Sequence, residues 1–246
     1  MSTERLDLEL VARGFADSRA KAQRLIKENR VQVNDEPAKK TSQKVSAEAQ
    51  IVVEARDREW VGRGAYKLLA ALDHFRFDPR GLVAADIGAS TGGFSEVLLS
   101  RDIAKIYAVD VGHGQLHRSL LTDPRLINLE GVNAKSLNVQ VIEDPLDMVV
   151  SDVSFISLKK ALPAPLSLCK TGASLTALIK PQFEVGKQNL GKGGIVKDPS
   201  LAEAVRLDME QWINSLPGWK CLGTIESPIT GADGNREFLL GAIYDA

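Results

Sequence analysis

Two lysines and two carboxylates stand where apolar segments of this sequence begin or end. Lys180 follows SLTALI, Asp152 follows LDMVVS, Lys67 lies in RGAYKL, and Glu237 precedes FLLGAIY. A lysine takes a proton from a hydroxyl group only in its neutral form, which requires desolvation or a neighbouring cation. Mixed charges also compensate one another when buried together. The set predicts a site that takes or orients a hydroxyl proton at Lys180, although each residue alone, Lys67 above all, also fits an ordinary surface charge.

A glycine-rich segment, DIGASTGGF, follows the first apolar run of the larger part of the chain. Glycines let a backbone approach a ligand closely, and a helix start presents free N–H groups. The spacing of Gly88, Gly92 and Gly93 is not G-x-G-x-x-G, which argues against a dinucleotide. Asp110 ends the next apolar run, where a carboxylate can accept both hydroxyls of a ribose. The pattern predicts an adenosine-containing cofactor without a pyrophosphate; the alternative is that Asp86 and Asp110 only cap helices.

These residues must be positioned by alternating apolar and amphipathic segments. Strands are predicted at 82–88, 105–111, 125–131, 146–152, 174–180, 219–226 and 236–244, and helical segments are GFSEVLLSR, GQLHRSLL, SLKKALPAPLSLC and SLAEAVRLDMEQWINSL. Near-continuous apolar strands indicate a parallel sheet covered on both faces. The last two strands are joined without a helix and should pair antiparallel. The fold class is therefore α/β, a doubly wound Rossmann-like sheet with an antiparallel last strand and its ligand site at the strands' carboxyl ends.

Residues 4–56 form a smaller α+β unit. An apolar helix face precedes Gly14, and Ser18 is a candidate N-cap for a second helix, SRAKAQRLIKEN. The other face of that helix carries Arg19, Lys21, Arg24, Lys27 and Arg30. Short strands follow in RVQVN and QIVVEA. A basic helix face on a small sheet suits folded RNA, whose shape and phosphates are read more than its base edges; a solvated surface helix is the alternative.

The segment GKQNLGKGG (186–194) fits a phosphate-binding NTPase loop except that Gly193 stands where a Mg²⁺-binding hydroxyl is needed. It follows a strand without opening a helix at once, so the NTPase interpretation is rejected. We interpret it as a flexible lid whose Lys187 and Lys192 meet the RNA backbone, with a plain mobile loop as the alternative.

Bulk properties exclude several classes of protein. The 246 residues carry a formal net charge of -1, which argues against coating nucleic acid by overall charge. Two cysteines without C-x-x-C spacing favour a reducing cytoplasmic setting, and no apolar run approaches membrane length. The three histidines do not suggest a metal site.

Longer motifs carry family resemblances. RLD followed by SRAKAQRLIKENRVQVN resembles the S4-type RNA-binding domain, and D-x-G-x-S-T-G-G-F with VDVG resembles the S-adenosylmethionine-dependent methyltransferases, specifically the FtsJ-like ribose methyltransferases. We expect an RNA-binding domain over 1–58, a linker over 59–64 and a methyltransferase domain over 65–246. The FtsJ-like resemblance implies catalytic residues Lys67, Asp152, Lys180 and Glu237. It implies cofactor contacts from Asp86, Gly88, Ala89, Ser90, Thr91, Gly92, Gly93, Phe94, Asp110, Val111, Asn133 and Asp152.

RGAYKL, DIGASTGGF, DVGHGQL, SDVSFISL, IKPQFEVGK and GKGG together closely resemble the TlyA family over nearly the whole chain. That resemblance implies 2′-O-methylation of a cytidine in ribosomal RNA. The chain ends two residues after the last predicted strand, which favours the large ribosomal subunit as substrate. The expected RNA contacts are Arg5, Arg19, Lys21, Arg24, Lys27, Arg30, Arg63, Lys187 and Lys192. The alternatives are a ribosome assembly factor with an inactive methyltransferase fold and a hemolysin, a name also used in this family.

Overall fold

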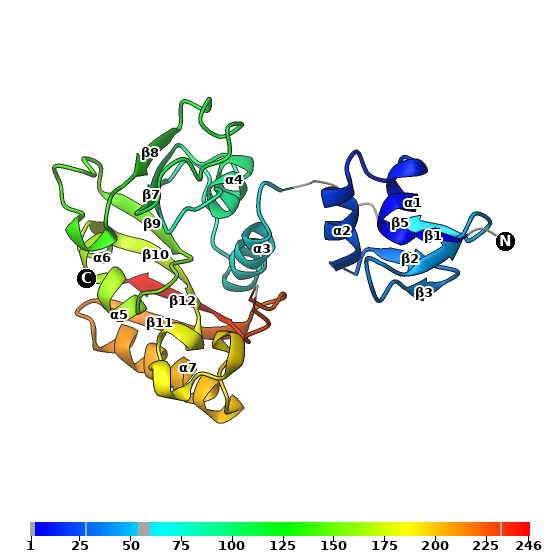
Figure 1. Ribbon diagram of the computed structural model, residues 1–246. Helices are drawn as coiled ribbons and strands as arrows, with labels where there is room; N and C mark the ends of the chain where they lie inside the picture. The colour runs from blue at the N-terminus through cyan, green and yellow to red at the C-terminus, as the bar shows by residue number, and fades with distance from the viewer. Residues whose placement is uncertain (1–2, 28, 54–59, 232) are drawn as a thin grey trace. The chain divides into compact units, whose positions relative to one another are not determined.

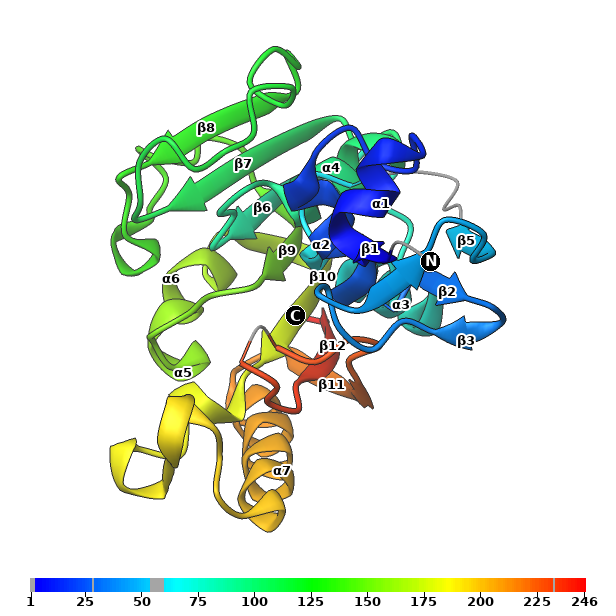
Figure 2. The ribbon, with the colours of Figure 1, turned by 45° about the vertical axis from the view of Figure 1, so that its right-hand side comes forward.

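The contacts within the chain divide it into two units, Met1–Glu59 and Trp60–Ala246. The larger unit contains a sheet of seven strands. The computed structural model describes residues 3–27, 29–53, 60–231 and 233–246. The strand order is β11-β12-β10-β9-β6-β7-β8, and Figure 2 shows the strands side by side. They are β6 (Val83–Ile87), β7 (Lys105–Asp110), β8 (Leu126–Glu130), β9 (Leu146–Ser151), β10 (Cys169–Ile179), β11 (Trp219–Glu226) and β12 (Phe238–Tyr244).

The strand directions confirm the predicted doubly wound sheet. β6 to β10 are mutually parallel, whereas β12 runs antiparallel between β10 and β11. β6 is the middle one of the five parallel strands, and the chain moves to β7 and β8 on one side before crossing to β9 on the other. Ligands bind at such a switch point, outside the carboxyl ends of the strands. The segments after β6, β7, β9 and β10 therefore share one edge of the sheet.

Both faces of the sheet are covered by helices, as Figure 1 shows. Alternate residues point to opposite faces of a strand, so Ala84 packs with α3 (Gly64–Phe75) and α4 (Gly93–Ser100), whereas Ala85 faces the other layer. That second layer contains α5 (Leu158–Ala161), α6 (Pro163–Leu166) and α7 (Pro199–Ser215). The buried strands are apolar on both faces for this reason.

Two local predictions differ from the structure. The segment GQLHRSLL (114–121) forms turns where a helix was predicted. Its backbone N–H groups at Gln115 and Leu116 are held by the Glu130 carboxylate at the end of β8, at 2.7 and 3.1 Å. Leu116 and Leu120 are buried against α4, so the apolar spacing serves tertiary packing. Conversely, Arg63 and Gly64, predicted as the end of the linker, are the N-cap and the first residue of the regular helix α3.

The segment after residue 59 packs on the larger unit. Trp60 and Val61 lie against the cluster of α3 and α4, and the Val61 N–H donates to Glu96 Oε2 at 2.6 Å. Of the predicted linker, Glu59 is outside the described residues, and Gly64 already belongs to α3.

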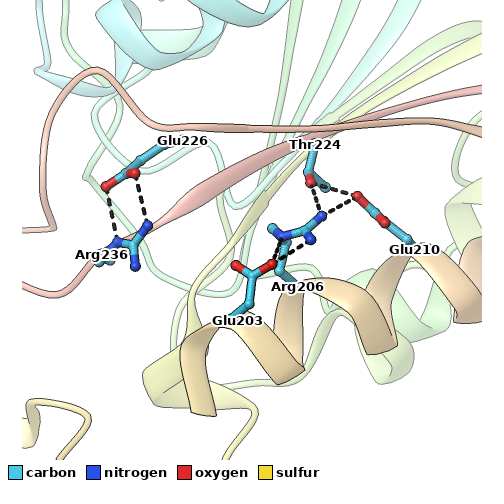
Figure 3. A network of polar contacts seen from close by, with 6 residues as sticks. All are labelled: Glu203, Arg206, Glu210, Thr224, Glu226 and Arg236. Atoms are coloured by element: carbon cyan, nitrogen blue, oxygen red, sulfur yellow. Dashed lines mark hydrogen bonds and ion pairs between the residues drawn. The ribbon is translucent and has the colours of Figure 1, made fainter. Parts of the chain in front are cut away.

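An ion network ties α7 to the outer strand β11 (Figure 3). The Arg206 guanidinium donates to Glu203, Glu210 and the Thr224 hydroxyl, at 2.5 to 2.8 Å. Arg236 pairs with Glu226 beside it, at 2.9 and 3.1 Å. Because Arg206 presents several donors in one plane, it joins two turns of the helix to the strand.

The smaller unit has two helices over short strands. They are α1 (Leu6–Ala12), α2 (Arg19–Lys27), β1 (Thr3–Arg5), β2 (Val31–Val33), β3 (Glu36–Pro37), β4 (Lys44–Ser46) and β5 (Ile51–Val53). Ser18 accepts the Lys21 N–H at 3.3 Å, the geometry of the predicted N-cap. Asn34 and Asp35, with φ of 51° and 66°, make the turn into β3. Leu6, Leu10 and Ala22 belong to a separate core.

Candidate active site

The four charged residues form two ion pairs. Lys180 Nζ lies 2.5 Å from Asp152 Oδ1 and donates to Ser154 Oγ at 2.8 Å. Lys67 Nζ donates to Glu237 Oε2 at 2.5 Å. The side chains of Lys180, Lys67 and Glu237 are 11%, 9% and 2% exposed. Each buried charge therefore has an opposite charge in direct contact, the arrangement that low-dielectric surroundings require.

The sheet brings the two pairs together. Lys180 follows β10 and Asp152 follows its parallel neighbour β9, so both residues leave the sheet at the same edge. On the other side of β10, Ile179 is paired with Phe238, so Lys180 and Glu237 occupy the next opposed positions. Directly opposed residues of antiparallel strands have Cβ atoms about 5 Å apart. The first turn of α3, which carries Lys67, lies beside Asp152: a Cβ at Gly64 would be 3.5 Å from Asp152 Oδ2.

A cavity of about 320 Å³ opens next to Asp152. The ends of β6 and β7 and the segments after β8 and β9 contribute to its walls, including Gly88, Asp110, Asn133 and Ser154. Asp110 accepts the Ser90 N–H at 2.8 Å on one oxygen and the Gly112 N–H at 2.7 Å on the other. A carboxylate fixed by two backbone groups is held ready to accept ribose hydroxyls with its remaining lone pairs.

A smaller cavity of about 190 Å³ adjoins the first, sharing Gly88, Ser90 and Asp152 with it. It is bounded by Gly62, Arg63 and Gly64 at the start of α3 and by the glycine-rich segment. Asp86, which is 0% exposed, also lines it. Ser95 donates to Asp86 Oδ2 at 2.7 Å, whereas Oδ1 has no partner among the described residues. An unsatisfied buried acceptor facing a cavity fits a ligand that brings a donor or a cation.

Burial raises the pKa of Asp86 to about 7, and the nearby charge of Asp152 adds to the shift while the Ser95 hydrogen bond opposes it. The group thus changes charge close to neutral pH.

The glycine-rich segment allows two close approaches. A Cβ at Gly88 would lie 3.0 Å from the backbone after β9, and its φ of +85° disfavours other residues. A Cβ at Gly92 would collide with Leu116 and Leu120, so this glycine serves packing of the turn 114–121. Gly92 lines neither cavity. Every other residue expected to contact the cofactor lines at least one of them: Asp86, Gly88, Ala89, Ser90, Thr91, Gly93, Phe94, Asp110, Val111, Asn133 and Asp152.

Sequence reasoning missed several residues that line the larger cavity, among them Gln115, Ser154 and Phe155. Phe155 is 90% exposed and has a φ of 64°, which is strained for a bulky side chain. The motif SDVSF placed it beside Asp152 along the chain, but only the backbone angle reveals that it is held outward. Glu130 was also missed: hydrogen bonds from Asn128 and the 115–116 backbone lower its pKa to about 2.

The residues expected to contact RNA are dispersed. Lys187 and Lys192 are exposed. Their segment contains an internal hydrogen bond, in which the Gly191 N–H donates to Ile195 O at 2.7 Å. Asn235 fastens this segment near Glu237, accepting from Val196 N–H and donating to Gly194 O. Arg63 lies at the smaller cavity and donates to Thr230 O at 3.2 Å. On the smaller unit, Arg19, Arg24 and Lys27 are exposed and Arg5 and Lys21 half-buried, whereas Arg30 is only 7% exposed; its burial does not fit the expected basic face.

Residues 60–244 match the FtsJ-like methyltransferase family, and residues 4–51 match the S4 domain. The chain belongs to the FtsJ-like methyltransferases. Members of this family use S-adenosylmethionine. In the described part of this FtsJ-like chain, no cluster of three or more His, Cys, Asp or Glu could hold a metal ion. No helix there is long and apolar enough to cross a membrane.

Close relatives place this FtsJ-like chain in the TlyA family. It is 45% identical to the 16S/23S rRNA (cytidine-2′-O)-methyltransferase TlyA of Mycobacterium tuberculosis, over 96% of this chain and 88% of the relative. It is 37% identical to Hemolysin A of Brachyspira hyodysenteriae, over 96% and 98%. A solved structure from Streptococcus thermophilus, provisionally titled a hemolysin, covers all of this chain and 90% of its own, with a TM-score of 0.74 and 34% identity.

Proposed function

We propose that this protein transfers a methyl group from S-adenosylmethionine to the ribose 2′-hydroxyl of a cytidine in ribosomal RNA. The observation that carries the proposal is that Asp152, the ion-pair partner of Lys180, lines both cofactor cavities, with the Lys67–Glu237 pair opposite Lys180 in the sheet. The S4 domain supports RNA as the substrate, and a relative named as a ribosomal RNA cytidine methyltransferase supports the nucleotide. We expect an enzyme of this kind to act in the cytoplasm.

The residues that would hold the cofactor divide between its two ends. Asp110 would accept the ribose hydroxyls, with Asn133 and Val111 beside the adenine in the larger cavity. Asp86 would face the amino-acid ammonium group in the smaller cavity. When bound, S-adenosylmethionine supplies an electrophilic methyl group. The role of the remaining residues is to orient the target hydroxyl and remove its proton.

Lys180 is the group we assign to the target hydroxyl. Ser154 and Asp152 hold its Nζ from two directions, which leaves one direction for the substrate. To accept the hydroxyl proton, Lys180 must first lose one of its own to solvent, and the ion pair with Asp152, 2.5 Å away, keeps its Nζ in place. Lys67 and Glu237 place a second ammonium and carboxylate beside this pair, so the local charge stays balanced.

A transfer assay tests the function directly. Purified protein is incubated with tritiated S-adenosylmethionine and with ribosomal subunits or free ribosomal RNA, and the labelled nucleotide is mapped. We expect label on a ribose 2′-oxygen of a cytidine in the large subunit, because 23S appears in the names of the relatives from M. tuberculosis and Campylobacter jejuni. RNA and cofactor binding without any transfer would instead indicate an assembly factor, and lysis of red cells by purified protein alone would indicate a hemolysin.

Phe155 is expected to support the target base. Its ring lies 5.0 Å from that of Phe183, over which Lys180 Nζ sits at 5.9 Å from the centroid. An outward aromatic ring beside the proton-accepting group offers a stacking surface, and base stacking contributes about 1–3 kcal/mol per base. We expect Phe155→Ala to raise the KM for RNA about tenfold or more and Phe155→Tyr to restore it. Leu222→Ala, on the far outer strand, is the control; equal KM values for the alanine variant and wild type would contradict this role.

The segment 186–197 is expected to contact RNA phosphates. Double replacement of Lys187 and Lys192 by alanine should weaken RNA binding and flatten the slope of log K against log salt by about 1.5. The matched control is Lys170→Ala/Lys220→Ala, which removes two lysines near the opposite end of β10. RNA binding is measured by fluorescence anisotropy at several salt concentrations. An unchanged slope would show that Lys187 and Lys192 do not contact RNA phosphates.

A further inference from the structure

A fully buried carboxylate organises the basic surface of the smaller unit. Asp7, on α1, is 0% exposed and accepts four hydrogen bonds from three side chains. Arg5 donates through Nε and Nη2 at 2.9 and 3.0 Å, Arg19 through Nε at 3.0 Å, and Gln23 at 2.7 Å. The hydrogen bonds from Arg5, Gln23 and Arg19 hold the pKa of Asp7 well below its ordinary value. The carboxylate is therefore charged at neutral pH.

Two guanidinium groups converge on this carboxylate yet remain accessible. Arg5 Nη2 and Arg19 Nε each lie 3.0 Å from Asp7 Oδ2, so they can be no farther apart than twice that distance. The Arg5 and Arg19 side chains are 34% and 53% exposed. A guanidinium has five N–H donors, and the bonds to Asp7 use two from Arg5 and one from Arg19. The other donors are free to face a ligand from a fixed position.

A third cation lies next to the pair. Arg5 in β1 is paired directly with Lys44 in the antiparallel strand β4, and Lys44 is exposed. Side chains of opposed residues project from the same face. Glu4, the neighbouring acid, instead turns its carboxylate to the Arg5 backbone N–H at 2.9 Å.

We propose that Asp7 is a positioning residue that fixes Arg5 and Arg19 as a paired clamp for one stretch of RNA backbone phosphates, with Lys44 as its third contact. Planar guanidinium groups bind phosphate through two parallel hydrogen bonds, and this geometry works best when the group is already held. Fixing a mobile arginine side chain when a ligand binds costs conformational entropy. The hydrogen bonds to Asp7 already fix these side chains in the folded protein, so less entropy is lost on binding. The inference rests on the proposed function only in taking RNA as the ligand.

The decisive comparison is between two substitutions that remove the same negative charge. In the full chain, Asp7→Asn and Glu4→Gln each make the smaller unit more positive by one charge. Charge alone predicts tighter RNA binding for both variants. Positioning predicts that Asp7→Asn binds a transcribed large-subunit ribosomal RNA fragment about tenfold more weakly, while Glu4→Gln binds equally well or better. Equal affinities for the two variants would overturn the proposal.

A second background separates positioning from loss of fold. The double variant Arg5→Lys/Arg19→Lys keeps both positive charges but lacks the planar guanidinium groups. We therefore expect it to bind RNA more weakly than wild type. Adding Asp7→Asn to it should then cost no further affinity; a further tenfold loss would mean that Asp7 acts only through stability. Circular dichroism melts accompany each variant. A wild-type chain that binds RNA but fails to methylate it would defeat the proposed function and leave this test intact.

Discussion

Replacing Lys180 with alanine is expected to lower kcat for methyl transfer about 10²- to 10⁴-fold, the usual contribution of a positioned general base. The affinity for S-adenosylmethionine should stay nearly unchanged, because Lys180 lines neither of the two cofactor cavities. Its loss leaves Asp152 with an uncompensated charge, so a melt must show that the variant remains folded. Calorimetry for the cofactor and tritium transfer at saturating RNA measure the two quantities separately.

A more conservative variant sharpens the test of Lys180. Arginine at this position keeps the positive charge but stays protonated and cannot act as a base. Lys180→Arg should therefore keep cofactor and RNA binding while losing transfer to a similar extent. The control is Lys170→Ala, at the opposite end of the same strand. Appreciable turnover by the arginine variant would show that Lys180 supplies only charge, and the base would have to be sought elsewhere.

The sequence predicts the site's framework well because buried parallel strands have a strong signature. The inner strands β6, β7, β9 and β10 are rich in buried apolar residues, and charged residues stand at or just after the carboxyl ends of β7, β9 and β10. Asp110, Asp152 and Lys180 are such residues, so the order of the strands places them at one edge without further information. The pairing of Lys67 with Glu237 could not be predicted, because it depends on where α3 packs against the sheet.

Features decided by tertiary contacts are not visible in local patterns. The spacing of Leu116 and Leu120 fits a helix, but the segment forms turns, and Glu130 holds the backbone N–H groups of Gln115 and Leu116 at its start. Arg30 has the residue type of an RNA contact but is buried. Asp7 is the opposite case, a residue that the sequence did not single out. In the sequence it is one acid of a mixed helix, and only the fold shows that three side chains donate hydrogen bonds to it.

Asp86→Asn is expected to change cofactor affinity and stability in opposite directions. Asp86 is buried with one unsatisfied oxygen at the smaller cavity, where we place the ammonium group of S-adenosylmethionine. Losing one member of a buried, hydrogen-bonded charge pair costs about 2–5 kcal/mol. At pH 8 the variant should therefore bind the cofactor at least about 30-fold more weakly. Wild-type affinity should rise as the pH increases through about 7, where Asp86 ionises, and the variant should lack this rise.

Without cofactor, Asp86→Asn is expected to stabilise the folded protein, whereas it weakens cofactor binding. The pKa of Asp86 is raised from 3.8 to about 7 in the folded chain, so the folded state holds a proton that the unfolded state has lost between those values. The contribution of Asp86 to the free energy of unfolding of the wild type therefore falls as the pH rises from about 4 to 7. Asparagine carries no charge, so the variant should gain about 4 kcal/mol over wild type at pH 8 and nothing at pH 4. Ser95→Ala removes the opposing hydrogen bond and should move both transitions to higher pH. Denaturant unfolding at pH 4 and 8 measures the gain; a variant that is less stable than wild type at pH 8 would show that Asp86 is satisfied within the fold and does not await a cation.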